Sequence, residues 1–161
     1  MHEHGWLHRD VKPSNIGFGR GGAAKLLDFG LTRWAQGRVS DANAADRPAD
    51  DTPIGALAGT LLYLSPDVLD GESPAESDDV WALSVVLAEM ITGTNPFHAA
   101  SRAGVLARVR RRAPVDIGRA APDVPAPVVD VLNRALRPHR SQRIAKAREL
   151  GAALRGLTRA S

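Results

Sequence analysis

The strongest pattern of apolar positions in the chain lies between residues 76 and 92. Large apolar residues recur on nearly every side of this stretch, namely Val80, Trp81, Leu83, Val85, Val86, Leu87, Met90 and Ile91. A helix that is apolar nearly all round is usually buried, so the pattern predicts a central helix from Glu76 to Thr92. Ser77 is the candidate N-cap, Asp78 and Asp79 complement the positive end of the helix dipole, and Gly93 ends the helix.

Weaker amphipathic patterns predict three shorter helices in the second half of the chain. We expect them at about residues 98–112, 126–136 and 146–157. The apolar faces of the last two carry Val128, Leu132 and Leu136, and Leu150, Leu154 and Leu157. The second half is therefore predicted to be helical.

The first half shows a different pattern. Residues 15–18 and 25–27 are predicted strands around the glycine-rich turn 19–22, and residues 1–7 are typical of the end of a helix. Residues 17–22 also match G-x-G-x-x-G, but a strand rather than a helix follows, so a hairpin turn is favoured over a dinucleotide site. The polar, proline-containing residues 35–55 are typical of a mobile loop.

Composition narrows the class of protein. The 161 residues are 43% hydrophobic and 24% charged, as in an ordinary globular domain, and the absence of cysteine excludes disulfides and thiolate metal sites. No apolar run is long enough to cross a membrane and no signal peptide opens the chain, so we expect a cytoplasmic protein without a membrane segment.

The net charge of +3 raises the question of nucleic-acid binding, because arginines gather locally. They are Arg102, Arg108, Arg110, Arg111, Arg112 and Arg119. Helical spacing of Val105 and Val109 leaves most of them on a wet face, and no aromatic residue is interleaved for base stacking. A solvated surface is favoured, with no nucleic-acid partner.

Two short motifs carry the candidate chemistry. His8-Arg9-Asp10 is followed by Asn15 in the order H-R-D-x-x-x-x-N, and Asp28-Phe29-Gly30 comes next. Phosphoryl transfer needs a carboxylate that orients the attacking hydroxyl and oxygen ligands for the magnesium on the nucleotide phosphates. The chain thus resembles the bacterial eukaryotic-like (Hanks-type) serine/threonine protein kinases from residue 1 to about residue 157.

The resemblance implies a protein-kinase-like α+β fold and only its C-terminal lobe, mainly helical with a short β-hairpin. That lobe would cover residues 1–157, with an activation segment at about 28–67 and a tail at 158–161. The family's N-terminal lobe, with its glycine-rich loop and ATP-anchoring lysine, would precede His8 and is expected to be missing. We therefore expect a truncated kinase that binds ATP weakly or not at all and exposes apolar surface.

The resemblance also implies catalytic roles. Asp10 would be the catalytic carboxylate, and Lys12 would contact the transferring phosphate of ATP. Asn15 and Asp28 would hold Mg²⁺, for which hard oxygen donors are suited. Thr60 would hydrogen-bond to Asp10 and Lys12, as in kinases that phosphorylate Ser or Thr of a protein substrate.

Other residues resemble regulatory and structural positions of the family. Arg9 would pair with a phosphate on the activation segment, for which Thr32, Ser40 and Thr52 are candidate acceptors if the kinase phosphorylates itself. His8 would be a core hydrogen-bonding imidazole next to the turn of Phe29 and Gly30, rather than part of a metal cluster with His2 and His4, which are read as surface residues.

Two further structural positions concern the base of the lobe. Asp79 would hold the backbone of the catalytic loop. Asp67 stands where the family usually has Glu and would pair with Arg143, so a strained or water-bridged ion pair is expected. His139 and Arg140 replace a usual Asp-Pro pair, with an expected effect on packing rather than chemistry.

Of three functional interpretations we adopt the first, with the second as the alternative. The first is a serine/threonine protein kinase that transfers the γ-phosphate of ATP. The second is a noncatalytic remnant of a kinase lobe that acts as a protein-interaction module. The third, a helical nucleic-acid-binding protein, depends only on the arginine cluster.

Overall fold

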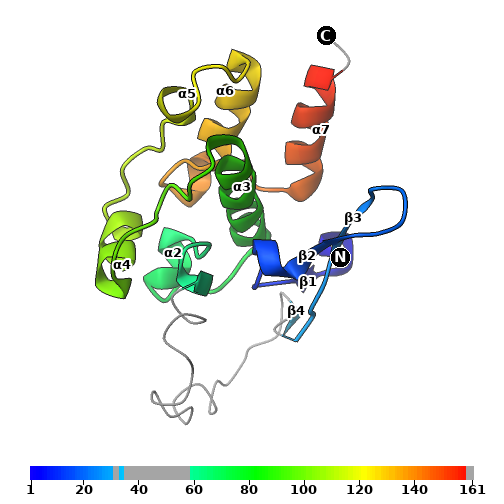
Figure 1. Ribbon diagram of the computed structural model, residues 1–161. Coiled ribbons are helices and arrows are strands. Elements are labelled where there is room, and N and C mark those ends of the chain that lie inside the picture. The colour runs from blue at the N-terminus through cyan, green and yellow to red at the C-terminus, as the bar shows by residue number, and fades with distance from the viewer. Residues whose placement is uncertain (31–32, 35–58, 159–161) are drawn as a thin grey trace.

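The computed structural model describes residues 1–30, 33–34 and 59–158. Helices make up most of the molecule, and small two-stranded sheets lie at the side of the N-terminus (Figure 1). In chain order the elements are η1 (His2–His4), β1 (Trp6–Leu7), η2 (Pro13–Asn15), β2 (Ile16–Phe18), β3 (Ala24–Leu26), β4 (Arg33–Trp34), α2 (Pro66–Leu69), α3 (Glu76–Thr92), α4 (Arg102–Arg110), α5 (Ile117–Ala120), α6 (Ala126–Ala135), η3 (Arg140–Gln142) and α7 (Ala147–Thr158).

Helix α3 is the centre of the fold, and its predicted bounds are confirmed. It packs against α6 and α7, and Val80, Trp81, Val85, Val86 and Ala88 are each at most 2% exposed. The ring of Trp81 stacks on Phe97 with 5.4 Å between centroids. Met90 is the exception to the apolar pattern, since it is 69% exposed.

The start of α3 differs from the prediction. Ser77 is not the N-cap but lies buried in the first turn, and Ala75 is the cap residue. Ala75 has no side-chain oxygen to accept from the N–H groups of the first turn. The Asp78 carboxylate makes the reverse bond and accepts from the Ala75 N–H at 2.8 Å. At the other end Gly93 adopts φ 73°, as predicted for a glycine that closes a helix.

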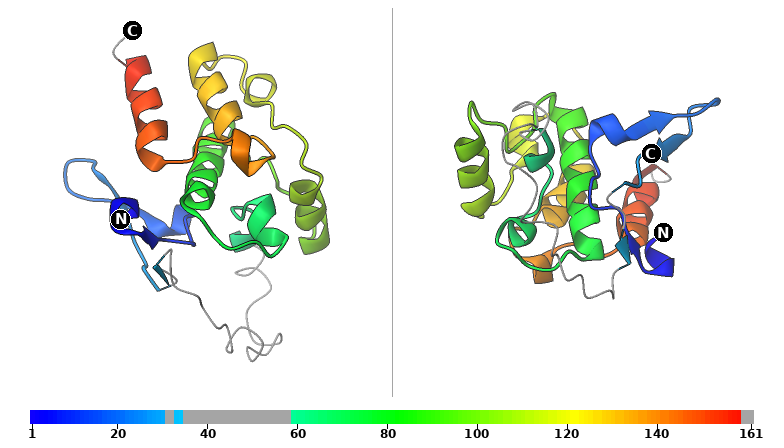
Figure 2. Two further views of the ribbon diagram at one scale, coloured as in Figure 1. Left: turned by 180° about the vertical axis from the view of Figure 1, so that it is seen from behind. Right: turned by 90° about the horizontal axis from the view of Figure 1, so that it is seen from below.

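The predicted hairpin is present with slightly shifted strands. Strands β2 and β3 pair antiparallel, with Gly17 opposite Lys25. Gly21 and Gly22 take φ 85° and 79° in the turn, a conformation that disfavours other residues. The hairpin projects away from the helices in both views of Figure 2.

The N-terminus corrects an expectation. Residues 1–7 are not the end of a regular α-helix but the short 3-10 helix η1 and strand β1, which pairs antiparallel with β4. Gly5 separates the two, with a left-handed φ of 74° that ends the helical turn. The predicted loop 35–55 lies outside the described residues.

The remaining helices are close to their predicted places. Helix α4 is shorter than expected because Ser101 caps it, accepting a hydrogen bond from the Gly104 N–H. Helices α2 and α5, each one turn long, were not anticipated. No helix among the described residues is long and apolar enough to span a membrane.

Candidate functional site

The loop after β1 is fixed to α3 by one carboxylate. The backbone N–H groups of His8 and Arg9 donate to the two oxygens of Asp79, each at 2.8 Å. Arg9 has φ 68°, a conformation that costs a non-glycine residue roughly 1–3 kcal/mol. The paired hydrogen bonds hold this strained backbone in place, so the contact that the resemblance predicts for Asp79 is present.

The side chains of Asp10, Lys12 and Asn15 meet directly after this anchor. Oδ2 of Asp10 lies 2.8 Å from Lys12 Nζ and accepts a hydrogen bond from Asn15 Nδ2 at 2.9 Å. Asn15 Nδ2 also donates to the Asp10 carbonyl at 2.8 Å. The other carboxylate oxygen, Oδ1, is buried and has no hydrogen-bond partner among the described residues.

Thr60 reaches the same site from a distant part of the chain. Lys12 Nζ donates to Thr60 Oγ1 at 3.1 Å, so the predicted contact with Lys12 is present. The described residues contain no hydrogen bond between Thr60 and Asp10, where one was expected. Both residues line a small cavity of about 40 Å³ beside the loop.

Asp28 lies at the open end of the hairpin and is linked to the loop through its neighbour. The N–H of Leu27 donates to the Asn15 carbonyl at 2.8 Å, and His8 Nε2 is 3.0 Å from the Leu27 carbonyl. Asp28 is exposed and its backbone has φ 57°. Its carboxylate accepts a hydrogen bond from the Gly30 N–H at 3.1 Å. Among the described residues its carboxylate contacts neither Asp10 nor Asn15, so three of the four expected residues are in mutual contact.

His8 is the core imidazole that was predicted. It is fully buried, and Nδ1 accepts a hydrogen bond from the Asp10 N–H, which leaves Nε2 to donate to Leu27. Its ring packs edge-on against Phe29 at 5.3 Å between centroids. His8 therefore connects the loop of Asp10 with the turn of Asp28-Phe29-Gly30.

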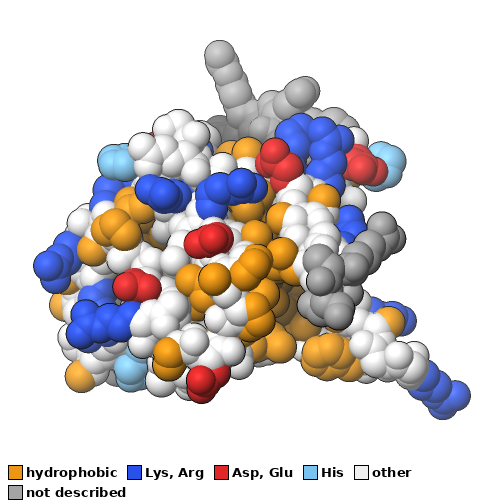
Figure 3. All heavy atoms as spheres, turned by 90° about the horizontal axis from the view of Figure 1, so that it is seen from above, with side chains coloured by type: hydrophobic (Ala, Val, Ile, Leu, Met, Phe, Trp, Pro, Cys, Tyr) orange, Lys and Arg blue, Asp and Glu red, His pale blue; other side chains and the backbone are white. Residues whose placement is uncertain are grey.

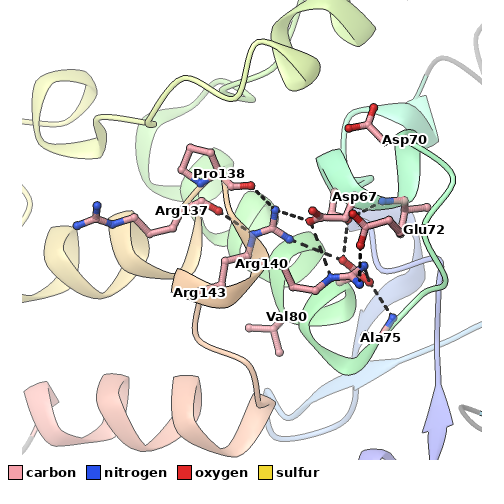
Figure 4. A network of polar contacts seen from close by, with 12 residues as sticks. Asp67, Asp70, Glu72, Ala75, Val80, Arg137, Pro138, Arg140 and Arg143 are labelled. Carbon is pink, nitrogen blue, oxygen red and sulfur yellow. Dashed lines mark hydrogen bonds and ion pairs between the residues drawn. The ribbon is translucent and has the colours of Figure 1, made fainter.

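The ion pair of Asp67 with Arg143 is direct, so of the two expected forms, strained or water-bridged, the water-bridged one is wrong. Arg143 Nη2 lies 2.7 Å from Asp67 Oδ2, although the angles fall outside those of a hydrogen bond. Arg143 also donates to the carbonyls of Arg137 and Pro138 (Figure 4). Its guanidinium lies over the ring of Trp81, 4.4 Å from the centroid. Because these contacts bring the guanidinium close to α2, the shorter Asp side chain reaches it.

Two arginines for which the sequence predicted no ion pair, Arg112 and Arg140, complete this network. Arg112 lies 3.3 Å from Asp67 and 2.8 Å from Asp70. Arg140 lies 2.9 Å from Asp78 and 3.0 Å from Glu72. The sequence feature that could have pointed to these ion pairs is the run of carboxylates between residues 67 and 78. Two of these carboxylates, Asp67 and Asp78, are buried and therefore need basic partners.

The arginine network changes the pKa of Asp67. Burial alone would raise that pKa, but Arg143, followed by Arg112 and Arg140, outweighs burial and lowers the pKa below its ordinary range. Arg112 is thus not part of a solvated arginine face, whereas Arg108, Arg110 and Arg111 are exposed as predicted.

Two other polar contacts were missed. Tyr63 donates to Glu89 at 2.7 Å, and burial together with this bond raises the pKa of Tyr63. His2 is not a free surface residue, because its ring nitrogens lie 3.1 Å from Glu76 and 2.8 Å from Asp79. Neither contact has a motif in the sequence, since each partner lies far along the chain.

The expected pairing of Arg9 with a phosphate on the activation segment stays a prediction. Nε of Arg9 is buried without a hydrogen-bond partner among the described residues. Thr32, Ser40 and Thr52 lie outside the described residues.

Comparison with known proteins identifies the family. The family model described as protein kinase domain matches residues 1–152. The chain is 36% identical over 153 residues to the serine/threonine-protein kinase PknB of Mycolicibacterium smegmatis, covering 95% of this chain and 23% of that protein. It is 34% identical over 163 residues to the serine/threonine-protein kinase PknK of Mycobacterium tuberculosis, covering 98% of this chain and 13% of that protein. The chain therefore spans less than a quarter of either relative. By this match and by its motifs, it belongs to the protein kinase domain family, among the Hanks-type serine/threonine kinases of bacteria.

Proposed function

We propose that this chain is the C-terminal lobe of a serine/threonine protein kinase and supplies the floor of its active site. The reaction is transfer of the γ-phosphate of ATP to a Ser or Thr hydroxyl of a protein substrate. The observation that carries the proposal is the asymmetry of the Asp10 carboxylate. Lys12 and Asn15 hold one oxygen, while the other is buried without a partner among the described residues.

This asymmetry suits the orientation of a hydroxyl nucleophile. Oδ1 of Asp10 accepts the hydrogen bond of the substrate hydroxyl, and Oδ2 stays bound to Lys12 and Asn15, so the carboxylate cannot rotate away. Lys12 lies between Asp10 and Thr60, where its charge faces the incoming phosphoryl group. Positioning and charge are the main contributions a protein makes to this reaction.

The residues proposed for Mg²⁺ fit that ion. Asn15 uses its amide nitrogen toward Asp10, which leaves its amide oxygen available, and Asp28 presents an exposed carboxylate with one oxygen beyond its bond to Gly30. Mg²⁺ in kinase sites is held by few protein oxygens together with phosphate oxygens and water. When bound, the ion neutralises charge on the phosphates.

Substitution of Asp10 by Asn tests the proposal. The assay uses the longest reading frame that contains this chain, because the chain covers 23% of one kinase relative and 13% of another. We expect Asp10→Asn to lower kcat by roughly 10²–10⁴-fold, the contribution of a positioned proton acceptor. The matched control is Asp123→Asn, an exposed carboxylate in the same lobe, which leaves kcat unchanged. Full activity of Asp10→Asn at an unchanged melting temperature refutes the role.

The second candidate, a noncatalytic protein-interaction module, has one observation in its favour. A groove of about 610 Å³ opens between the hairpin, η1, α3 and the start of α7, and none of Asp10, Lys12, Asn15 and Asp28 lines it. If the protein encoded by the longest reading frame shows no phosphorylation, and Asp10→Asn changes nothing, this candidate replaces the first.

A further inference from the structure

His2 is held between two carboxylates at the start of the central helix. Its Nδ1 lies 3.1 Å from Glu76 Oε1 and its Nε2 lies 2.8 Å from Asp79 Oδ2. The side chain is 12% exposed, so water does not replace these partners freely. A neutral imidazole has a hydrogen on only one ring nitrogen, whereas the cation donates from both. The geometry therefore matches the protonated ring.

Asp79 connects this histidine with the catalytic loop. Its Oδ2 faces both His2 Nε2 and the His8 N–H, and its Oδ1 accepts from the Arg9 N–H. Asp10 follows Arg9 directly. A change at His2 thus reaches the proposed catalytic carboxylate through one shared side chain and two backbone hydrogen bonds.

The charges around His2 favour its cationic form. Its direct partners on α3 are both acidic, and Glu3 belongs to its own element. The basic groups along the same groove are the α-amino group of Met1, next to His2 in the chain, Lys25 on β3, and Lys146 and Arg148 at the start of α7. The hydrogen bond to Asp79 raises the pKa of His2 and outweighs burial, which lowers it.

We propose that His2 is a positioning residue of the catalytic loop, whose protonated imidazole holds Asp79 through a charge-assisted hydrogen bond. Loss of the proton weakens this hold, because the neutral ring is uncharged and has one N–H for two carboxylates. The inference depends on the proposed function only for its consequence in catalysis. The His8 and Arg9 amides should therefore sense the protonation of a side chain in another element. No covalent step is involved, since only a proton leaves the ring for solvent.

The first experiment follows this coupling by NMR on the whole 161-residue chain, labelled with ¹⁵N. We expect the amides of His8 and Arg9 to shift with the same midpoint as the His2 ring, and that midpoint to lie above the ordinary value of about 6.5. His2→Gln abolishes the shift of both amides, whereas His4→Gln, an exposed histidine of the same 3-10 helix, preserves it. Flat amide shifts across the titration of His2 overturn the proposal.

The second experiment measures stability and exchange against pH. A raised pKa adds stability that is complete below the unfolded value and is lost as pH rises through the folded value. At pH 5.5 we expect the amide hydrogens of His8 and Arg9 to exchange with solvent roughly fivefold faster in His2→Gln than in the wild type. This is the rate ratio for loss of a hydrogen bond of about 1 kcal/mol. The ratio becomes smaller above the folded pKa, where the charge on the ring is lost. An exchange ratio that does not depend on pH identifies a purely structural role and overturns the inference.

Neither experiment depends on phosphoryl transfer. Loss of the Asp10→Asn effect on kcat would refute the proposed function and leave the His2 coupling intact. In the longest reading frame, the coupling predicts that His2→Gln lowers kcat at pH 6 more than at pH 8.5, with the KM for ATP unchanged.

Discussion

Asp67 is a buried carboxylate with three arginines around it. It is 3% exposed, and Arg143, Arg112 and Arg140 approach its carboxylate at 2.7, 3.3 and 3.9 Å. Arg143 is itself fully buried, so each charge depends on the other for compensation. This network fixes α2, and with it the end of the segment that carries Thr60, to the start of α3 and to the residues before α7.

Removal of the Asp67 charge should therefore be strongly destabilising. Asp67→Asn leaves Arg143 buried with Asp78 at 3.7 Å as its remaining carboxylate, and we expect the free energy of unfolding to fall by roughly 3–5 kcal/mol. Urea denaturation measures the change. The matched control is Asp70→Asn, whose side chain is 40% exposed, with an expected effect of about 0–1 kcal/mol. Equal effects of the two substitutions would contradict this account.

The lowered pKa of Asp67 also predicts a pH dependence. Because the folded pKa lies below the unfolded one, the ion pairs add stability above about pH 3.9, and this stability is lost as pH falls through the folded pKa. Acid denaturation followed by circular dichroism should show that the stability difference between the wild type and Asp67→Asn narrows below pH 4. A difference that stays constant down to pH 2 would exclude Asp67 as its source.

At the level of elements, α3 is held by packing on several sides. Leu132 and Leu136 of the α6 region, Ile117 of α5 and Phe97 belong to one apolar cluster with the side chains of α3, and Leu132 is completely buried. The tight contacts of this helix matter for the candidate site because Asp79, which anchors the loop of His8 and Arg9, lies in its first turn.

Truncation of Leu132 tests this packing. Leu132→Ala removes buried methyl groups and leaves a cavity, so we expect a loss of roughly 2–5 kcal/mol in the free energy of unfolding. Met90→Ala, at a 69% exposed position on α3, should stay within about 0.5 kcal/mol of the wild type. Thermal or urea unfolding distinguishes the two. A small loss for Leu132→Ala would mean that α6 is not tightly packed on α3.

At the scale of the whole molecule, an apolar groove of about 610 Å³ lies between the hairpin, η1, α3 and the start of α7. Its apolar lining includes Val11, Ile16, Leu26, Val80 and Leu83. Figure 3 shows hydrophobic side chains gathered in a hollow of the face seen from above. Exposed apolar surface promotes association, and association of this chain stays a prediction.

The separation of this groove from the catalytic cluster leads to a prediction about ATP. The residues proposed to contact ATP phosphates and Mg²⁺ lie on the loop after β1 and at the open end of the hairpin. None of these residues, Asp10, Lys12, Asn15 and Asp28, lines the groove. We expect the 161-residue chain alone to show no saturable thermal shift with Mg²⁺-ATP up to millimolar concentration. A ligand at about 100 times its Kd would stabilise the fold by roughly 2.7 kcal/mol. A clear saturable shift, lost in Asp28→Asn, would show that the chain binds the nucleotide without help.

Much of the fold and of the catalytic cluster was predictable because the signals were local. The bounds of α3 follow from an apolar pattern and a terminal glycine. Asp10, Lys12 and Asn15 lie within six residues of one another, so a single loop conformation brings them together. Ser77 was wrongly predicted as the N-cap because Ala75, which takes that position, has no polar side chain that would mark it. The Asp78 carboxylate accepts a hydrogen bond from the Ala75 N–H.

The order of residues alone therefore specified the family, the central helix, the hairpin and the reactive loop. Only the tertiary structure decided which charges compensate one another: Arg112 with Asp67, 45 residues apart, and His2 with Asp79, 77 residues apart. Helical periodicity and motif spacing depend on neighbours along the chain, whereas an ion pair depends on which elements the packing of the core brings within a few ångströms.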